Sequence, residues 1–215
     1  IIVPVEESSK RFREEMKRLD MPAVALTRRT KDMDCVYVDH IEAGRQVGSH
    51  LGRLGCEAYI FAGTTRDGKY EGFLEGLKEA DPNCEASLTN IGTKNSEEIR
   101  KKIKKHFKKH TGKTGIFAYN DRRAIQIHGL LKELGVEIPQ QASLVGFDNT
   151  YTCEFLYPGL SSVSQPNREM AEKAVQRLIW KIEHPEESSI LDEPMKAELI
   201  IRGSSDDACS MAAER

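Results

Sequence analysis

Short apolar runs alternate with longer amphipathic segments along most of the chain. Residues 58–62, 115–119 and 142–147 form apolar runs of the length and residue content expected of buried strands. Val47, Leu51 and Leu54 recur at helical spacing. Strands that alternate with helices of this length are typical of βαβ units and predict an α/β fold with parallel sheets. The expected strands are 1–5, 23–26, 35–38, 58–62, 84–91, 115–119, 142–147, 160–164 and 197–201, and the expected helices are 7–19, 41–54, 68–80, 96–110, 121–134 and 166–182.

Several helix ends carry residues that favour a boundary. Gly55 stands where a left-handed C-cap is expected after residues 41–54. Ser96 and Asp121 are the residue types that cap helix N-termini, and Pro166 suits the first turn of the last helix. The tail after residue 205 is small and polar, and we expect it to be disordered.

Composition narrows the class of protein. The 215 residues carry 32 Lys and Arg against 34 Asp and Glu, and the mean hydropathy is −0.53. No apolar run approaches the roughly 20 residues of a membrane span, and the near-neutral balance argues against a nucleic-acid surface over the whole chain. Five cysteines without a CxxC pair favour reduced thiols in a cytoplasmic protein.

One short motif raises the possibility of nucleotide chemistry. Residues 63–69 fit the phosphate-binding pattern GxxxxGK between an expected strand and helix. Tyr70 replaces the Ser or Thr that would bind magnesium, and a phenol does not fit that small site. A ligand-facing turn at the end of a strand is the favoured interpretation.

Basic residues crowd the segment 100–110. Ile99, Ile103 and Phe107 recur there at helical spacing, so one face is expected to be buried and the lysines to lie in solvent. A phosphate-binding patch is the alternative.

Catalytic and metal-binding patterns do not emerge from the sequence. It lacks HExxH and GxSxG, and its six histidines do not have metal-ligand spacing. We therefore expect neither enzymatic activity nor a metal or cofactor.

Three groups of motifs, in order, resemble the effector-binding module of the lactose/galactose-repressor family of bacterial transcription regulators. The strongest extends from Ala118-Tyr119-Asn120-Asp121 through residues 131–139 to Gly146-Phe147-Asp148-Asn149. The others are residues 160–166 with 198–202, and residues 36–44 with Glu71-Gly72-Phe73. Together they cover about residues 1–205.

The resemblance implies a periplasmic-binding-protein-like clamp of two parallel α/β lobes that holds a small effector, with the first lobe incomplete. The implied N-terminal lobe comprises residues 1–35 and 164–190, and the C-terminal lobe 36–163 and 191–205, with crossovers near 33–38, 162–165 and 188–193. Residues 206–215 would form the disordered tail. It also implies a homodimer, no membrane association, and operator DNA bound only through an N-terminal domain missing from this chain.

Site residues follow from the same resemblance. Asn120 and Asp148 end two expected strands, where an open sheet presents ligand contacts, and their side chains suit sugar hydroxyls. Lys69 replaces an arginine that reaches the effector in the family, and it lacks the bidentate fork. Thr27 and Asn167 replace a pocket aspartate and an aromatic residue, which makes the pocket more polar. Asp121 is expected to cap its helix instead.

The predicted function is that of a sugar-responsive domain that controls DNA binding. Arg66, together with Arg28 and Arg29, leaves an acidic or phosphorylated sugar open as the effector, although exposed loop arginines are the favoured interpretation of all three. The alternative is a solute-binding protein of a sugar transporter, which resembles the same two-lobed fold.

Overall fold

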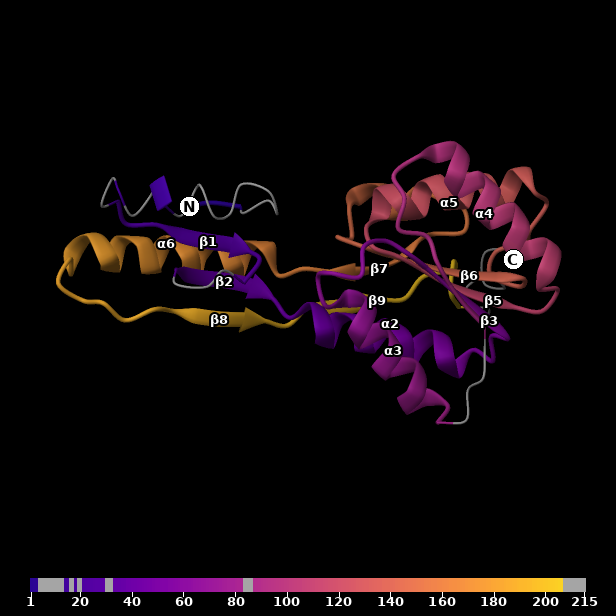
Figure 1. Cartoon of the computed structure of the whole chain (residues 1–215), viewed down its shortest axis with the longest axis horizontal. Helices are drawn as coiled ribbons and strands as arrows, with labels where there is room; N and C mark the ends of the chain where they lie inside the picture. The colour runs from indigo at the N-terminus through magenta and orange to yellow at the C-terminus, as the bar shows by residue number, and fades with distance from the viewer. Residues whose placement is uncertain (4–13, 16–17, 19–20, 30–32, 83–86, 207–215) are drawn as a thin grey trace. The chain divides into compact units, whose positions relative to one another are not determined.

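The computed structural model describes residues 1–3, 14–15, 18, 21–29, 33–82 and 87–206. The chain divides into two compact units, each assembled from two stretches of sequence (Figure 1). Unit 1 comprises Ile1–Asp39 and Gln165–Ala197, and unit 2 comprises His40–Ser164 and Glu198–Arg215. The chain therefore changes unit after Asp39, Ser164 and Ala197.

Unit 2 is built on a six-stranded sheet with the order β4-β3-β5-β6-β7-β9. Its first five strands are parallel, and β9 pairs antiparallel with β7 at the edge. Every residue of β3, β5 and β6 is buried, as expected for central parallel strands covered on both faces. The strands are β3 (Ala58–Ala62), β4 (Ser87–Asn90), β5 (Thr114–Ala118), β6 (Ala142–Phe147), β7 (Ser161–Ser164) and β9 (Glu198–Ile200).

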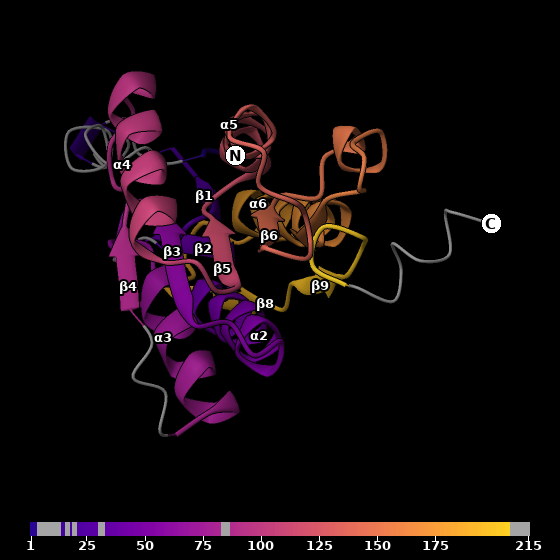
Figure 2. The same cartoon turned by 90° about the vertical axis from the view of Figure 1, so that its right-hand side faces the viewer.

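Helices cover both faces of this sheet. α2 (His40–Arg53) and α3 (Lys69–Ala80) lie on one face, and α4 (Ser96–Lys109) and α5 (Asp121–Glu133) lie on the other (Figures 1 and 2). A short 3₁₀ helix, η1 (Tyr151–Glu154), follows β6. Since successive strand residues point to opposite faces, each strand supplies two cores. Phe61 and Phe117 pack with Phe73 of α3, whereas their neighbours Ile60 and Ile116 join the core that contains residues of α4 and α5.

Unit 1 contains a parallel three-stranded sheet with the order β1-β2-β8. Its elements are β1 (Val24–Thr27), β2 (Asp34–Val38), β8 (Asp192–Met195) and α6 (Asn167–Glu183), which packs against β1 and β2. Asp34 is fully buried and accepts hydrogen bonds from Arg177 and Lys181 of α6 and from the Leu191 N–H. These bonds lower the pKa of Asp34, although burial alone raises it.

The predicted α/β fold is confirmed, and β3 and β6 have the predicted bounds. Most other elements begin or end within a few residues of the prediction. Ile2 forms a parallel bridge with Ala25, whereas residues 4–5 and most of the expected helix 7–19 lie outside the described residues, as do residues 207–215 of the expected tail. Gly55 has the expected left-handed conformation, with φ 66°.

Two features of unit 1 differ from the sequence prediction. Residues 188–193 were expected to contain a crossover, but β8 begins there and pairs with β2. Both β2 and β8 belong to unit 1 because they share the sheet of β1, so the units change after Asp39 and Ala197, where the expected lobe boundaries were 35–36 and 190–191.

The helix caps also differ from the prediction. Asn95 and Asn120 are the N-caps of α4 and α5, one residue before the predicted Ser96 and Asp121. Each asparagine accepts a hydrogen bond from the backbone N–H three residues later, which is the function that defines a cap.

In the part of the chain that the structure describes, no helix has the length and apolarity to cross a membrane.

Candidate functional site

Lys69 connects three strand ends at the carboxyl edge of the unit 2 sheet. It is the first residue of α3, and only 9% of its side chain is exposed. Its Nζ donates to the Tyr119 carbonyl oxygen after β5 at 3.2 Å and lies 3.9 Å from the ring centroid of Phe147, the last residue of β6. A desolvated cation over an aromatic ring is stabilised by about 2 kcal/mol. Lys69 therefore holds the ends of β5 and β6 against the turn that follows β3.

Asp67 completes the environment of Lys69. Its Oδ2 lies 3.4 Å from Lys69 Nζ, and its Oδ1 accepts the Lys69 backbone N–H at 3.3 Å. The Asp67 side chain is 6% exposed, so the two charges face each other largely out of solvent. Gly68 between them has φ 84°, a left-handed conformation that glycine adopts without strain.

Asn120 and Asp121, at the start of α5, accept different hydrogen bonds. Asn120 Oδ1 accepts the Arg123 N–H at 2.9 Å. Asp121 is 1% exposed and accepts from Ser162 Oγ, from Thr150 N–H at 2.7 Å and from Cys153 Sγ at 3.2 Å. Burial and this carboxylate raise the pKa of Cys153 to about 11, which keeps the thiol protonated. Asp121 is therefore a structural residue, as expected, but it anchors the segment after β6 instead of capping its helix.

Asp148 and Asn149 follow β6 in strained backbone conformations. Their φ angles are 106° and 44°, in the region that Asn and Asp adopt more readily than other non-glycine residues. The Asp148 N–H donates to the Val163 carbonyl at 2.9 Å, and Asn149 Nδ2 donates to Ser164 Oγ at 3.4 Å. Asn149 Oδ1 is buried without a hydrogen-bond partner among the described residues. Strain of this kind is concentrated at functional sites.

The structure therefore brings together Asn120, Asp148 and Lys69, three of the six predicted site residues, at one edge of unit 2. Arg66 lies in the turn before α3 and is exposed. Thr27 and Asn167 belong to unit 1: Thr27 ends β1 with φ 73°, and Asn167 is the exposed first residue of α6. Arg29, also in unit 1, forms two hydrogen bonds with Asp192 at 3.1 and 2.6 Å.

Asp67 and Tyr119 were not predicted as site residues. Asp67 precedes the Gly-Lys pair and could have been recognised as a residue type that accepts hydrogen bonds at a helix start. Tyr119 contributes its backbone carbonyl, for which the sequence carries no signal. Tyr70, the second residue of α3, packs its ring against that of Phe61, with the ring centroids 5.1 Å apart.

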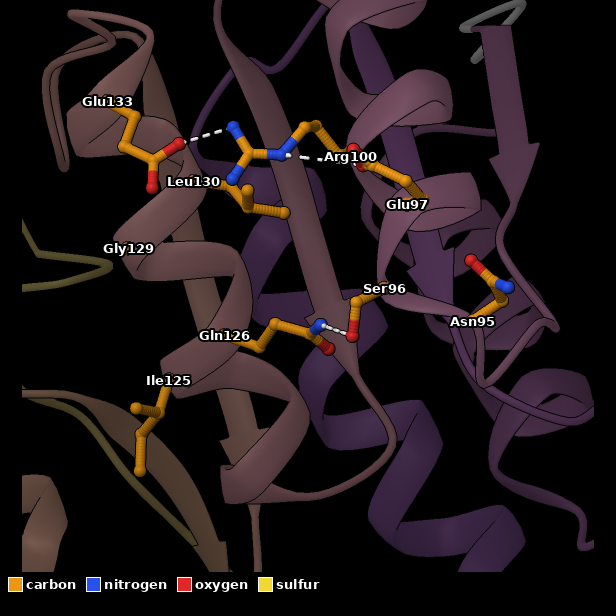
Figure 3. Close-up of a pocket in the computed structure, with 9 residues that line it drawn as sticks. All are labelled: Asn95, Ser96, Glu97, Arg100, Ile125, Gln126, Gly129, Leu130 and Glu133. Carbon is orange, nitrogen blue, oxygen red and sulfur yellow. Dashed lines mark hydrogen bonds and ion pairs between the residues drawn. The ribbon is translucent and has the colours of Figure 1, made fainter.

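A separate groove lies between α4 and α5 (Figure 3). Its volume is about 660 Å³, and its lining residues are Asn95, Ser96, Glu97, Arg100, Ile125, Gln126, Gly129, Leu130 and Glu133. Arg100 forms an ion pair with Glu133 across it, and Gln126 Nε2 donates to Ser96 Oγ at 2.9 Å. None of the predicted ligand residues lines this groove, so the candidate site is the carboxyl edge of the sheet instead.

Among the described residues, no cluster of His, Cys, Asp or Glu is arranged to hold a metal ion.

This combination defines a class of protein. Polar side chains, a buried lysine and strained backbone meet where a parallel sheet presents its carboxyl ends, the location at which open α/β sheets bind small ligands. The geometry is that of a ligand-binding module.

The comparisons with known proteins identify the family. The model of the periplasmic binding protein-like domain matches residues 49–205, and the chain belongs to this family. It is 32% identical over 143 residues to the HTH-type transcriptional regulator DegA of Bacillus subtilis, which covers 64% of this chain and 42% of DegA. It is 25% identical over 178 residues to the HTH-type transcriptional repressor PurR of Mannheimia succiniciproducens, covering 80% of this chain and 53% of PurR.

Solved structures agree in fold. A periplasmic binding protein/LacI transcriptional regulator of Alkaliphilus metalliredigens complexed with D-xylulofuranose superposes with a TM-score of 0.72 at 28% identity, covering 90% of this chain and 74% of that one. A LacI-family regulator of Enterococcus faecium with bound ribose gives 0.76 at 24% identity, covering 92% and 76%.

The resemblance to the effector-binding module of lactose/galactose-repressor regulators is confirmed, and these relatives favour a regulator over a transporter protein. The chain spans about half the length of the curated relatives it matches.

Proposed function

We propose that this chain is the effector-binding part of a bacterial transcription regulator, and that its effector is a small sugar. The observation that carries the proposal is the meeting of Asn120, Asp148 and Lys69 at the carboxyl edge of unit 2. A carboxylate accepts hydrogen bonds from sugar hydroxyls, and an amide both donates and accepts them. The sugars named with the structural relatives support the same ligand class.

Four of the six proposed contacts lie in unit 2: Asp148, Asn120, Arg66 and Lys69. Thr27 and Asn167 are the contacts that we propose for unit 1. Effector binding would change the affinity of the whole regulator for operator DNA. The names of the relatives, which are HTH-type regulators, support this proposal. Such a regulator would act in the cytoplasm, without a cofactor and without catalysing a reaction.

We further propose that the regulator is a homodimer that uses an aromatic patch of unit 2. The patch consists of Tyr151, Phe155 and Tyr157, which are 81%, 78% and 65% exposed. The rings of Tyr151 and Phe155 are 6.2 Å apart. Clustered exposed aromatic side chains are typical of protein interfaces, and a two-fold axis would place the patch against its own copy.

Calorimetric titration with D-ribose, D-xylulose and other free sugars tests the effector proposal. At least one sugar should bind the chain, and Asp148→Asn should weaken that binding tenfold or more, since a hydrogen bond to a charged group contributes about 1.5–3 kcal/mol. Asparagine tolerates the left-handed backbone at this position, so the variant should keep its fold.

Glu137→Gln is the matched control, because it removes an exposed carboxylate of unit 2 away from the strand ends. Its affinity should equal that of the parent. Failure of every sugar to bind, or equal affinities for the parent and Asp148→Asn, would contradict the proposal. Magnesium-dependent ATP turnover would instead favour a nucleotide hydrolase.

A further inference from the structure

Among the helices that begin at the carboxyl edge of the unit 2 sheet, α3 and α5 begin at positions where a protein could bind an anion. The free N–H groups at a helix N-terminus attract phosphate or carboxylate, and a nearby lysine strengthens the attraction. α3 begins with Lys69 after a turn that matches the phosphate-binding pattern, and α5 begins at Asp121. A phosphorylated sugar would therefore be the natural ligand if these groups were available.

At α3 the chain supplies its own anion. The Asp67 carboxylate accepts the first N–H of the helix with Oδ1 and faces the Lys69 ammonium with Oδ2, at 3.3 and 3.4 Å. The Lys69 ammonium is directed further to the Tyr119 carbonyl and the Phe147 ring. The Lys69 ammonium and the first N–H of the helix are therefore both engaged by the protein itself.

At α5 the situation is similar. Asn120 accepts an N–H of the first turn, and the buried Asp121 carboxylate adds a negative charge beside it. Arg123, in the same turn, donates to the Thr93 carbonyl at 2.9 Å and is 7% exposed. A ligand phosphate would meet a carboxylate at each helix start.

We infer that Asp67 is an internal anion that restricts the carboxyl edge of unit 2 to uncharged, hydroxyl-rich ligands and rejects their phosphorylated forms. The inference rests on the proposed function for the identity of the ligand. Its physical basis is local: Asp67 faces the Lys69 ammonium and accepts the Lys69 N–H, so an incoming phosphate would have to compete with Asp67 for both. Displacing Asp67 would leave a buried carboxylate without its partners, which is strongly unfavourable.

Removal of the Asp67 charge should create an anion site. In Asp67→Ser the hydroxyl can still accept the Lys69 N–H, so the helix start stays capped while Lys69 loses the Asp67 carboxylate. Calorimetry should show that inorganic phosphate binds this variant at least tenfold more tightly than it binds the parent. Lys69→Met in the same background should abolish the gain, because Lys69 supplies the charge.

Glu75→Gln is the matched control, since it removes one exposed carboxylate from α3 and leaves the Asp67–Lys69 pair intact. It should bind phosphate no better than the parent. Thermal melting of each variant verifies that it is folded, and Asp67→Asn provides a second neutral variant if the serine variant is not.

Titration of the parent with D-ribose and D-ribose 5-phosphate, and with other sugar and sugar-phosphate pairs, tests the ligand class. The free sugar of each pair should bind at least tenfold more tightly. A parent that prefers a sugar phosphate, or a folded Asp67→Ser that gains no affinity for phosphate, would overturn the inference. If no sugar of either kind binds, the proposed function fails, while the gain of phosphate binding still decides the role of Asp67.

Discussion

The buried carboxylate of Asp121 links three separate segments of unit 2. Its carboxylate accepts from β7 through Ser162, from the segment after β6 through the Thr150 N–H, and from η1 through Cys153. Thr150 lies two residues after Asp148, and Ser162 precedes Val163, whose carbonyl accepts the Asp148 N–H. Asp121 therefore fixes backbone beside a proposed ligand contact.

Replacement of Asp121 should therefore affect stability strongly. Asp121→Asn places an amide nitrogen, a donor, where one carboxylate oxygen accepts, and we expect a loss of about 2–4 kcal/mol in the free energy of unfolding. Urea denaturation followed by circular dichroism measures this loss. Glu137→Gln, which removes an exposed carboxylate, should change stability by less than about 0.5 kcal/mol, and a similarly small effect at Asp121 would contradict the assigned role.

The candidate site was predicted in part from the sequence, for a physical reason. Asn120 and Asp148 directly follow apolar runs, and the carboxyl ends of parallel strands meet at one edge, so their proximity follows from the pattern. Asp67 was not predicted because the residues around Gly68 match the phosphate-binding pattern GxxxxGK, in which the position of Asp67 can be any residue. The sequence does not indicate that the Lys69 side chain folds back onto Asp67, since this depends on Phe147 and Tyr119, which are distant along the chain.

At the scale of elements, α2 and α3 pack with their backbones in contact because glycines of each helix face the backbone of the other. A Cβ on Gly72 would lie 1.9 Å from the Ile41 carbonyl oxygen, and one on Gly44 would lie 2.3 Å from the Lys69 carbonyl oxygen. Both obstacles are backbone atoms, which side-chain rotation does not relieve. The second contact positions the start of α3, and therefore Lys69.

Gly72→Ala should separate these helices and destabilise unit 2 by about 1–3 kcal/mol or more, the range for overpacked cores. Urea denaturation measures the change in the free energy of unfolding. Gly129→Ala in α5 is the control, because a Cβ there meets nothing within 4 Å and alanine favours a helix by roughly 0.5–1 kcal/mol. Opposite signs for the two variants are expected, and equal effects would contradict the packing argument.

The sequence did not predict β8 because this strand forms only by pairing with β2, which is distant along the chain. β8 contains Asp192, Glu193 and Pro194, is largely exposed and has no apolar alternation, so it resembles a loop. It becomes a strand because β2 offers it a parallel edge. Proline at an edge strand is tolerated since its missing N–H can face away from the sheet.

At the scale of the whole molecule, the buried His106 and His128 and the half-buried His50 link stability to pH. Burial lowers the pKa of His50, His106 and His128, and that of His106 falls to about 4 with further contributions from His110 and Lys109. The His106 ring lies between Thr89 Oγ1 and Thr114 Oγ1, each at 3.2 Å.

Because the unfolded chain binds protons near pH 6.5 and the folded chain binds them only at lower pH, stability should fall as the pH decreases from about 6.5 to about 4. Urea midpoints measured between pH 4 and pH 8 test this expectation. In His106→Gln the dependence should be weaker over the same range. An unchanged slope in a folded His106→Gln would show that His106 does not contribute.

The aromatic patch leads to a prediction for assembly. Phe155→Glu should convert a dimer to a monomer, because the added charge would be buried against its own copy. Size-exclusion chromatography with light scattering measures the mass. Ile190→Glu, at an exposed apolar position of unit 1, should leave the mass unchanged, and a Phe155→Glu variant that stays dimeric would exclude the patch as the interface.

The interleaving of the two units has a consequence for the order in which the protein folds during synthesis. The first residues of unit 1 are synthesised before those of unit 2. The hydrogen bond from the Leu191 N–H to Asp34, and the pairing of β2 with β8, cannot form until residues about 157 positions later have been made. β3, β5, β6 and β7 all emerge before β8, so we expect most of unit 2 to fold while unit 1 is still incomplete. Protease digestion of ribosome-bound chains that end after residue 185 should spare residues 40–164 and cleave within residues 1–39.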